Sequence, residues 1–350
     1  MKNLSVIAPA VTILYETAAD CLATKLKALA PMDGDGDYIL YAKADVLFFD
    51  DGLLCRLFER ERTVLGSLAS PMAVLCPVAD GDATLESCVC EEEFNQGLSR
   101  LAERMLALGG RQMEAPAPYA PKEWRRRLEA YRVSVLEEHL DRGVSIPCFD
   151  GVMVSPLAVI GAGTEIQPGT QLRHGVTVGR HCNLGPNTVL EEASVGDGCT
   201  VNSTQIYRST LDESVKIGPF CHVRPGSHLC RGVKVGDFVE IKNSTVGADT
   251  HASHLTYIGD SDVGERVNFG CGVVTVNYNG VSKSRCVIGN DAFIGCNTNL
   301  VAPVTVGDFG YTAAGSTVTG DVGAGELAIA RARQVNKAGW VEKFREKNKK

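Results

Sequence analysis

The dominant pattern in this chain is an aliphatic side chain at every sixth position between about Val154 and Val318, with mostly polar residues between. The pattern occurs in three separate stretches, each with the same six-residue step, and Thr312 is the polar exception in the last of them. A glycine often follows the aliphatic residue, as in IGAG, VGRH, VGDF and IGND. The aliphatic positions are Val154, Ile160, Ile166, Leu172, Val178, Leu184, Leu190, Ile217, Val223, Leu229, Val235, Ile241, Ile288, Ile294, Leu300, Val306 and Val318.

A six-residue period fits neither the 3.6-residue turn of an α-helix nor the alternation of a simple strand. It fits one flat side of a triangular coil, with a short strand on each side and Gly, Asn or Asp at the corners, where positive φ is easiest. Three sides make a turn of about 18 residues, with the aliphatic side chains stacked inside. The pattern therefore predicts a parallel β-helix; an antiparallel β-sandwich is the alternative, which three separate stretches with the same six-residue step disfavour.

The register breaks between Phe269 and Ile288, where the intervening GCGVVTVNYNGVSKSRCV is too long for a corner. An insertion from a regular column is a natural place for binding residues. We therefore expect part of a functional site there.

The chain before the repeat has a different pattern. A buried strand followed by a loop and a helix is predicted for 38–61, and MAVLCPV predicts a second strand. A helix is predicted for 91–108, ended by Gly109 and Gly110, and another for 122–142. The second helix places its apolar face on Trp124, Leu128, Tyr131, Val135 and His139.

Composition and charge restrict the class of protein. The 350 residues are 44% hydrophobic and 22% charged, which is ordinary for a globular chain of about two domains. The net charge of −7 has no clustered basic footprint, so no nucleic-acid partner is expected. No stretch has the length of a membrane span, and the apolar run near Met1 lacks a good signal-peptide cleavage site. We therefore expect no membrane association and a cytoplasmic location.

The 13 cysteines form no recognisable framework. Their number is odd, no Cys-x-x-Cys occurs, and the two nearest in the sequence are Cys88 and Cys90. Reduced cysteines in a cytosolic protein are the favoured interpretation, and zinc ligation is the disfavoured alternative.

Several separated motifs lie in and just after the repeat region, all in one order along the chain. They are GPFCHVRPG, VEIKNSTVG, HLTYIGD, VNFGCG, NYNGVSK, IGCNTNLVAPVTVG, AAGSTVTGDV and AIARARQVNKAGW. Over about residues 125–340 the chain resembles the acetyltransferase half of the bifunctional enzymes that acetylate glucosamine-1-phosphate and then uridylylate the product. The resemblance implies a left-handed β-helix, against the usual crossover rule, and homotrimers with active sites between subunits.

The reaction of that family needs a base for the amine proton, cations for the sugar phosphate and a donor for the developing oxyanion. His254, in HASHLTY, matches the catalytic base, and Glu240 is hypothesised to orient its imidazole. Alone, His251 and His254 would also suit zinc-dependent carbonic anhydrases of this fold, but those need three converging histidines. The matches to sugar-phosphate ligands are Arg224, Lys242, Tyr257, Asn268 and Lys283. The matches to acetyl-CoA contacts are Cys271, Asn277, Tyr278, Cys296, Ala314 and Arg331.

The N-terminal region departs from the family. Its members carry a longer uridylyltransferase domain that opens with a loop of the type LAAGxGTRM, and this chain contains no such loop. YILYAKADVLFF faintly resembles the family's strand that ends in a magnesium-binding aspartate, which makes Asp45 the counterpart. We predict a shortened, inactive nucleotidyltransferase-like α/β domain at 1–120. A linker helix at 121–143, the left-handed β-helix acetyltransferase domain at 144–325 and a tail at 326–350 follow.

The sequence therefore predicts a mainly β enzyme, a glucosamine-1-phosphate N-acetyltransferase in the synthesis of UDP-N-acetylglucosamine for peptidoglycan and the cell envelope. Acetyl-CoA is the expected co-substrate and a homotrimer the expected assembly. No metal is expected for acetyl transfer, and Mg²⁺ only if the N-terminal domain is active. Two alternatives stay open: an enzyme that also retains pyrophosphorylase activity, and a non-catalytic trimeric scaffold.

Overall fold

The structure is a computed structural model, and it divides into two compact units, residues 1–198 and 199–350, which are described separately. The described residues are 4–7, 12–13, 16–17, 38–42, 63–67, 70–77, 91–113 and 120–348. Asp45 and the helix predicted before Glu61 lie outside the described residues.

The first unit begins with a five-stranded mixed sheet in the order β1-β4-β6-β5-β7. Helix α5 (Glu91–Ala107) packs on this sheet, and Tyr41, Val74, Leu98 and Met105 lie in their shared core. The predicted strand at Tyr38, the MAVLCPV strand and the helix at 91–108 are confirmed. The strands are β1 (Leu4–Ile7), β4 (Tyr38–Ala42), β5 (Thr63–Ser67), β6 (Ser70–Pro77) and β7 (Arg111–Met113), beside the hairpin β2 (Thr12–Ile13) and β3 (Glu16–Thr17).

Helix α6 (Pro121–Asp141) follows, with proline at the start of its first turn, where the missing N–H costs nothing. Its buried face carries Val135, Leu136 and His139, close to the apolar face predicted from the sequence. Arg132 ties the helix to the first coil, because Nη1 donates to the carbonyls of Phe149 (3.1 Å) and Val152 (2.7 Å).

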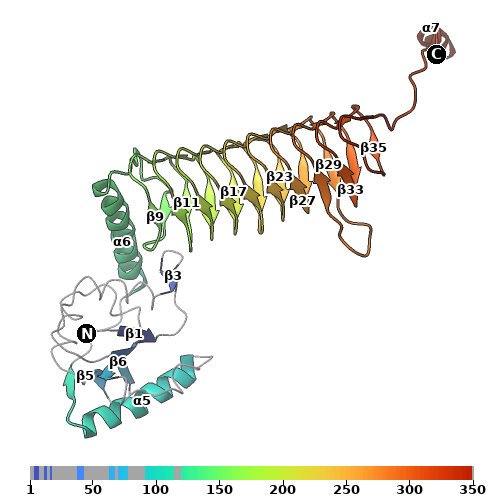
Figure 1. The fold of residues 1–350 in the computed structure, drawn as a ribbon. Helices are drawn as coiled ribbons and strands as arrows, with labels where there is room; N and C mark the ends of the chain where they lie inside the picture. The colour runs from blue at the N-terminus through green and yellow to red at the C-terminus, as the bar shows by residue number, and fades with distance from the viewer. Residues whose placement is uncertain are drawn as a thin grey trace. The chain divides into compact units, whose positions relative to one another are not determined.

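The rest of the first unit is a parallel solenoid whose short strands form three walls (Figure 1). Strands of one wall pair in parallel, usually with partners 18 residues apart, as Gln171 does with Val189. This confirms the six-residue period. The strands are β8 (Met153–Val154), β9 (Val159–Ile160), β10 (Glu165–Ile166), β11 (Gln171–Leu172), β12 (Thr177–Val178), β13 (Asn183–Leu184), β14 (Val189–Glu191) and β15 (Ser194–Val195).

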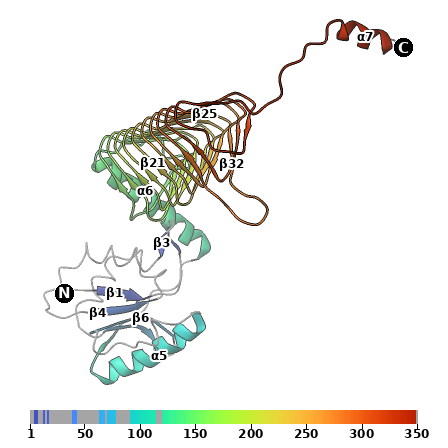
Figure 2. The ribbon, with the colours of Figure 1, turned by 45° about the vertical axis from the view of Figure 1, so that its right-hand side comes forward.

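The second unit has the same architecture, and Figure 2 shows its flat-sided coils stacked on one another. Its first wall holds β16 (Thr200–Val201), β19 (Lys216–Ile217), β22 (Lys234–Asp237), β25 (His251–His254), β28 (Asn268–Phe269), β31 (Phe293–Ile294), β34 (Tyr311–Thr312) and β36 (Leu327–Ala328). Its second wall holds β17 (Gln205–Tyr207), β20 (His222–Arg224), β23 (Glu240–Lys242), β26 (Tyr257–Gly259), β29 (Val274–Val276), β32 (Asn299–Val301) and β35 (Thr317–Val318). Its third wall holds β18 (Thr210–Leu211), β21 (His228–Leu229), β24 (Thr245–Val246), β27 (Ser261–Val263), β30 (Cys286–Ile288) and β33 (Val304–Val306).

Every aliphatic position of the predicted ladder is buried, so the ladder forms the core of the column. The polar exception, Thr312, is buried as well. Its hydroxyl lies 3.1 Å from that of Thr298 and accepts a hydrogen bond from the backbone N–H of Gly295 (3.0 Å). A buried hydroxyl with these partners avoids the desolvation penalty of an unpaired polar group.

The predicted break in register is an insertion that lengthens one coil of the second unit. Val274 pairs with Asn299, 25 residues on, whereas Asn299 pairs with Thr317, 18 residues on. The extra residues leave the column between β29 and β30 as a projecting loop (Figure 1). A bridge between Tyr278 and Lys283 closes the loop. Asn279 Oδ1 shapes its tip by accepting from the N–H groups of Val281 and Ser282 (2.9 and 2.8 Å).

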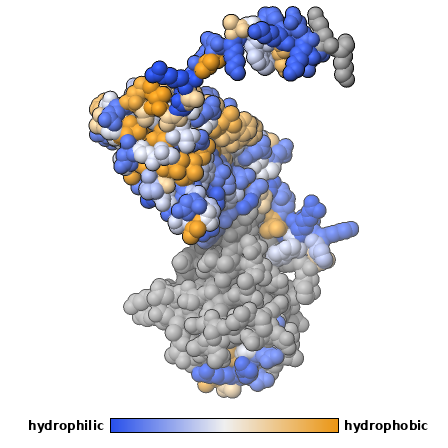
Figure 3. Space-filling model, turned by 90° about the vertical axis from the view of Figure 1, so that its right-hand side faces the viewer, coloured by the Kyte–Doolittle hydropathy of each residue, from blue (hydrophilic) through white to orange (hydrophobic). Residues whose placement is uncertain are grey.

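The end of the second unit extends into the segment predicted as a tail. Leu327 and Ala328 of β36 pair with β34, and helix α7 (Trp340–Lys347) buries no side chain. Figure 3 faces this end, where hydrophobic surface gathers, and the last coils expose Phe309, Leu327 and Ile329. None of the helices in the described part of the chain is both long and apolar enough to cross a membrane.

Candidate active site

Four of the predicted site residues occupy one corner of successive coils in the second unit. Each lies three residues after a position in one ladder of the first wall, which runs from His251 through Asn268 and Phe293 to Tyr311. Neighbouring strands are about 4.8 Å apart, so the side chains form a column. We call this set the corner column; its members are His254, Cys271, Cys296 and Ala314.

Backbone hydrogen bonds hold the corner column together. The carbonyl of Cys271 accepts from Asn297 N–H, and that of Cys296 accepts from Gly315 N–H, both at 2.8 Å. Arg331 extends the same edge, because its Cδ packs beside Gly315. Four of the six residues matched to acetyl-CoA contacts therefore lie along one edge: Cys271, Cys296, Ala314 and Arg331.

Residues matched to sugar-phosphate ligands gather on the second wall. Arg224 and Lys242 are register partners on β20 and β23, so their cationic side chains leave neighbouring strands at the same height. Arg224 Nη1 donates to Glu240 Oε1 at 2.9 Å. The side chains of both residues remain about two-fifths exposed, which leaves the guanidinium accessible to an anion.

Glu240 does not have the partner hypothesised for it. Its carboxylate accepts from Arg224, while neither ring nitrogen of His254 has a hydrogen-bond partner among the residues that the structure describes. His254 itself is exposed. The strand register explains why Glu240 and His254 do not meet. Glu240 pairs with His222 and Tyr257 on the second wall, whereas His254 ends a strand of the first wall. The hypothesis that Glu240 orients the imidazole has no support within one subunit.

A buried carboxylate, Asp260, connects the second wall with the inserted loop. Its side chain is only 7% exposed, and Oδ2 lies 3.7 Å from Lys242 Nζ. It accepts from the side-chain amide of Asn243 (2.6 Å) and from that of Asn277. Burial raises the pKa of Asp260, but these two amides and the ammonium groups of Lys242 and Lys283 hold the pKa below its ordinary value.

Sequence analysis missed Asp260, although a signal existed. Asn243, Asp260 and Asn277 are each 17 residues apart, which is the length of one coil here. A comparison of residues one coil apart, rather than along each strand, identifies this set of hydrogen-bonding side chains.

The inserted loop brings a second lysine to the same place. The pKa of Lys283 is lowered, chiefly by contact with the ammonium group of Lys242 and by its charge, with a smaller effect of burial; the negative charge of Asp260 opposes this. Two ammonium groups that face each other repel, and a bound dianion between them removes that repulsion. Arg224 and Lys242 on the second wall and Lys283 on the loop therefore concentrate positive charge that suits an anion. We call these three residues the anion site.

Tyr257 and Asn277 border this anion site. Asn277 Nδ2 donates to the Tyr257 hydroxyl at 3.3 Å as well as to Asp260. A Cβ at Gly259 would come within 2.7 Å of atoms of the Tyr257 ring, so the glycine leaves room for this ring in its present position. Asn277, matched to an acetyl-CoA contact, thus lies among the sugar-phosphate residues of its own subunit. Tyr278, also matched to acetyl-CoA, is 55% exposed and donates to the carbonyl of Gly280 (2.6 Å).

The corner column and the residues of the second wall that match sugar-phosphate ligands come together where the first and second walls join. His254 lies only three residues before Tyr257, and Thr256 Oγ1 fixes the turn between them by donating to the carbonyl of His254 (2.7 Å). Asn268 is exposed on the first wall, beside His251 in the ladder. An exposed histidine at this corner, beside cationic side chains, is an arrangement that could accept a proton from an amine of a phosphorylated substrate.

Parts of the chain are similar to known proteins. Residues 157–192 match the family model "Bacterial transferase hexapeptide (six repeats)". The chain is 47% identical over 205 residues to the bifunctional protein GlmU of Clostridium kluyveri, covering 59% of this chain and 45% of that protein. It is 49% identical over 207 residues to that of Clostridium acetobutylicum, again covering 59% and 45%. The resemblance found from the motifs is thereby confirmed.

The chain spans about half the length of the curated relatives that it matches. Among solved structures, an Arabidopsis UDP-N-acetylglucosamine acyltransferase is 17% identical, with a TM-score of 0.46 over 57% of this chain and 76% of that one. This likeness is too loose to bear on function. The hexapeptide repeat model and the strand pairing of the column confirm the predicted hexapeptide solenoid.

Proposed function

We propose that this protein is a glucosamine-1-phosphate N-acetyltransferase. It transfers acetyl from acetyl-CoA to the 2-amino group of the sugar phosphate, in the cytoplasmic synthesis of UDP-N-acetylglucosamine for peptidoglycan and other envelope polymers. Relatives that are 47 to 49% identical over more than 200 residues carry the name GlmU, and this name is one support. The other support is the position of the anion site beside the corner column.

The anion site is the observation that supports a sugar phosphate as the acceptor. Arg224, Lys242 and Lys283 supply three cations around one position, and Tyr257 borders it. Charge-assisted hydrogen bonds from such groups suit a phosphate monoester. With the phosphate held there, the sugar amine is proposed to extend toward the corner where His254 lies, and Asn268 is proposed to contact the sugar.

His254 is proposed as the general base. It accepts a proton from the amine while the amine nitrogen forms a bond to the acetyl carbonyl carbon. The carbon–sulfur bond then breaks, and the coenzyme A sulfur leaves with a proton. The backbone N–H of Cys271 is the proposed donor to the developing oxyanion. Neither step calls for a metal ion, and no side chain has to act as a nucleophile.

The corner column is proposed as the acetyl-CoA edge. Cys271, Cys296 and Ala314 present small side chains along several coils, which leaves room for an extended pantetheine arm. Arg331, at the end of this edge, is exposed and suits a phosphate of the coenzyme, because a guanidinium binds phosphate through two parallel hydrogen bonds. Asn277 and Tyr278 of the loop are proposed to contact a coenzyme bound to a neighbouring subunit.

We extend the proposal to a homotrimer whose subunits share each site, as the resemblance implies. The absence of a side-chain partner for His254 among the described residues of its own subunit supports this. Exposed apolar side chains next to the corner column support it too: Phe220, Phe238 and Leu255 are 58 to 60% exposed.

The first test mixes the purified chain with acetyl-CoA and glucosamine-1-phosphate and follows thiol release. His254→Ala should slow release by about 100- to 10,000-fold, the usual contribution of a general base. The matched control is His181→Asn, at an exposed corner of the first unit where φ is +55°, because asparagine tolerates that backbone. Equal rates for His254→Ala and wild type would reject the base. Absence of release from the folded wild-type protein would reject the acceptor.

The relatives' name covers two activities, and only acetyl transfer is proposed here. The family's glycine-rich nucleotide loop does not occur in this sequence. We therefore propose that the N-terminal domain forms no UDP-N-acetylglucosamine from UTP.

A further inference from the structure

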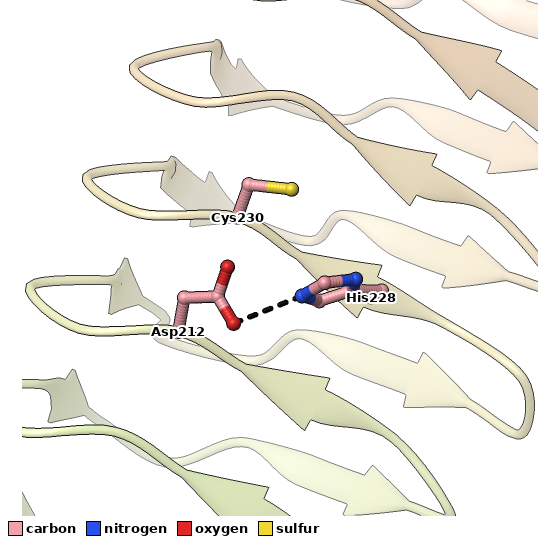
Figure 4. A group of neighbouring side chains, drawn as sticks. All are labelled: Asp212, His228 and Cys230. Atoms are coloured by element: carbon pink, nitrogen blue, oxygen red, sulfur yellow. Dashed lines mark hydrogen bonds and ion pairs between the residues drawn. The ribbon is translucent and has the colours of Figure 1, made fainter.

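Three potential metal ligands lie together on the second unit, away from the corner column. They are Asp212, His228 and Cys230, and Figure 4 shows their side chains directed toward one another from two adjacent coils. The carboxylate oxygen, imidazole nitrogen and thiol sulfur all lie within 4.8 Å of one another. His228 Nε2 is 2.9 Å from Asp212 Oδ1.

The backbone determines this convergence. Thr210 pairs with His228 and Leu211 with Leu229, so Asp212 and Cys230, the next residues of each coil, lie side by side. Leu229 points into the core and is fully buried. His228 and Cys230 flank it, and because residues two apart share one face of a strand, both side chains project outward. Each coil is fixed by hydrogen bonds from Asp212 N–H to Leu229 O and from Cys230 N–H to Val246 O, both 2.9 Å.

Cys230 differs from the buried cysteines of the solenoid. The thiols of Cys182, Cys199, Cys221 and Cys286 point inward and donate to backbone carbonyls. Cys230 is partly exposed, and its thiol has no such carbonyl acceptor among the residues that the structure describes. Its sulfur faces an imidazole and a carboxylate instead.

We propose that Asp212, His228 and Cys230 form a binding site for a borderline divalent metal ion, with Zn²⁺ the best fit. One nitrogen, one sulfur and one oxygen donor suit zinc, whereas Mg²⁺ and Ca²⁺ need oxygen ligands alone. Bond lengths of about 2.0 to 2.3 Å place tetrahedral ligand atoms roughly 3.3 to 3.7 Å apart. Small side-chain rotations reach this geometry from the observed separations.

Water is the fourth ligand of the proposed site. His228 and Asp212 are 44% and 35% exposed, so solvent reaches the cluster. The His228–Asp212 hydrogen bond opens when the ion binds, because the two atoms then bind the metal instead of each other. The ion links neighbouring coils of the column. This proposal is independent of the acetyl-transfer activity, since none of the three residues lies in the corner column or the anion site.

The test uses the full chain after treatment with a chelator and a reducing agent. Titration with Zn²⁺ against a chromophoric competitor measures stoichiometry and affinity, and Co²⁺ reports a thiolate ligand through its sulfur-to-metal charge-transfer band. We expect one equivalent of metal and a thiolate band with the wild-type protein. Cys230→Ser should abolish the band, and His228→Ala should weaken affinity at least about tenfold, since zinc sites with an open position keep three protein ligands.

Matched controls separate this site from other thiols. Cys148→Ser removes a partly exposed cysteine in the first unit, and Cys296→Ser removes an exposed one in the corner column. Both should bind one equivalent with the cobalt band intact. Circular dichroism and thiol release from acetyl-CoA should be unchanged in Cys230→Ser, which shows a folded column. No stoichiometric binding by the wild type, or binding that survives Cys230→Ser and is lost in Cys296→Ser, would overturn the proposal.

Discussion

At the scale of single residues, Asp260 organises the anion site. It contacts Lys242 and Asn243, which are adjacent on one coil, and Asn277 of the inserted loop. A buried carboxylate with several donors orients the cations around it. Asp260 also accounts for the position of Asn277, because the side-chain amide of Asn277 donates both to the Asp260 carboxylate and to the Tyr257 hydroxyl.

Asp260→Asn should change how stability depends on pH. The hydrogen bonds and nearby lysines lower the pKa of Asp260 in the folded state. A carboxyl group whose folded pKa is depressed stabilises the protein above its ordinary pKa, and this contribution is lost as pH falls toward the depressed value. The variant should be less stable at neutral pH by about 1 to 3 kcal/mol and should lose less stability on acidification.

Urea unfolding at a series of pH values from neutral to acid measures this effect. Asp141→Asn, at the exposed end of α6, is the control and should leave the pH dependence as in the wild type. Parallel curves for Asp260→Asn and wild type would show that Asp260 has the same pKa folded and unfolded.

At the scale of elements, the inserted loop depends on how its ends are held. Arg285 anchors the C-terminal end of the loop. Its guanidinium forms two hydrogen bonds with Asp262 (2.6 and 2.8 Å) and a third with the carbonyl of Asn243 (3.1 Å). Lys283 is two residues away, so the position of its ammonium group depends on this contact. The loop thus joins the second wall to the third, where β27 carries Asp262.

Arg285→Ala should raise KM for glucosamine-1-phosphate about two- to fivefold, the effect of losing an exposed bidentate ion pair, with a smaller change in kcat. Arg266→Ala is a close control, because Arg266 makes the same two-bond contact with Asp291 (2.8 and 2.9 Å) at a corner remote from the loop. Steady-state rates at varied sugar phosphate compare the two. The same KM in both variants would show that the loop does not need Arg285.

At the scale of the whole molecule, the exposed corner next to the proposed base indicates an interface. Phe220 and Phe238 occupy equivalent positions of adjacent coils and stack with ring centroids 5.4 Å apart. Both adopt positive φ, +59°, which bulky residues rarely do. Large apolar side chains held outward at a backbone cost are typical of a surface that another protein covers.

Phe238→Asn should therefore shift the proposed trimer toward monomers and reduce acetyl transfer, because each proposed site is shared between subunits. Asparagine favours the positive φ of that corner, so loss of folding is not expected. Phe309→Asn is the control: Phe309 is 62% exposed with φ of +57°, but its corner lies elsewhere on the coil. Sedimentation velocity and thiol release test both variants, and a Phe238→Asn trimer with full activity would contradict the assignment of this interface.

The sequence by itself determined the column, its six-residue ladder, the position of the insertion and the helices at 91–107 and 121–141. Each of these depends on neighbouring residues: a core position recurs every six residues because one wall of the coil is six residues long, and glycine or proline marks the helix ends. The motifs also identified Arg224, Lys242, Lys283 and Tyr257, which the fold brings together.

Only the tertiary structure decided which side chains meet. Glu240 pairs with Arg224 rather than with His254, Asp260 joins two asparagines each one coil away, and Asp212 reaches His228 across adjacent coils. The two residues of each pair are 16 or 17 positions apart in the sequence. Which residues face each other therefore depends on the exact length of each coil. That length varies by one residue from coil to coil, as the pairs Glu240–Tyr257 and His222–Glu240 show. A hydrophobic period tolerates such a change at a corner, whereas a hydrogen bond does not, and for this reason the pattern predicted the walls but not the contacts on them.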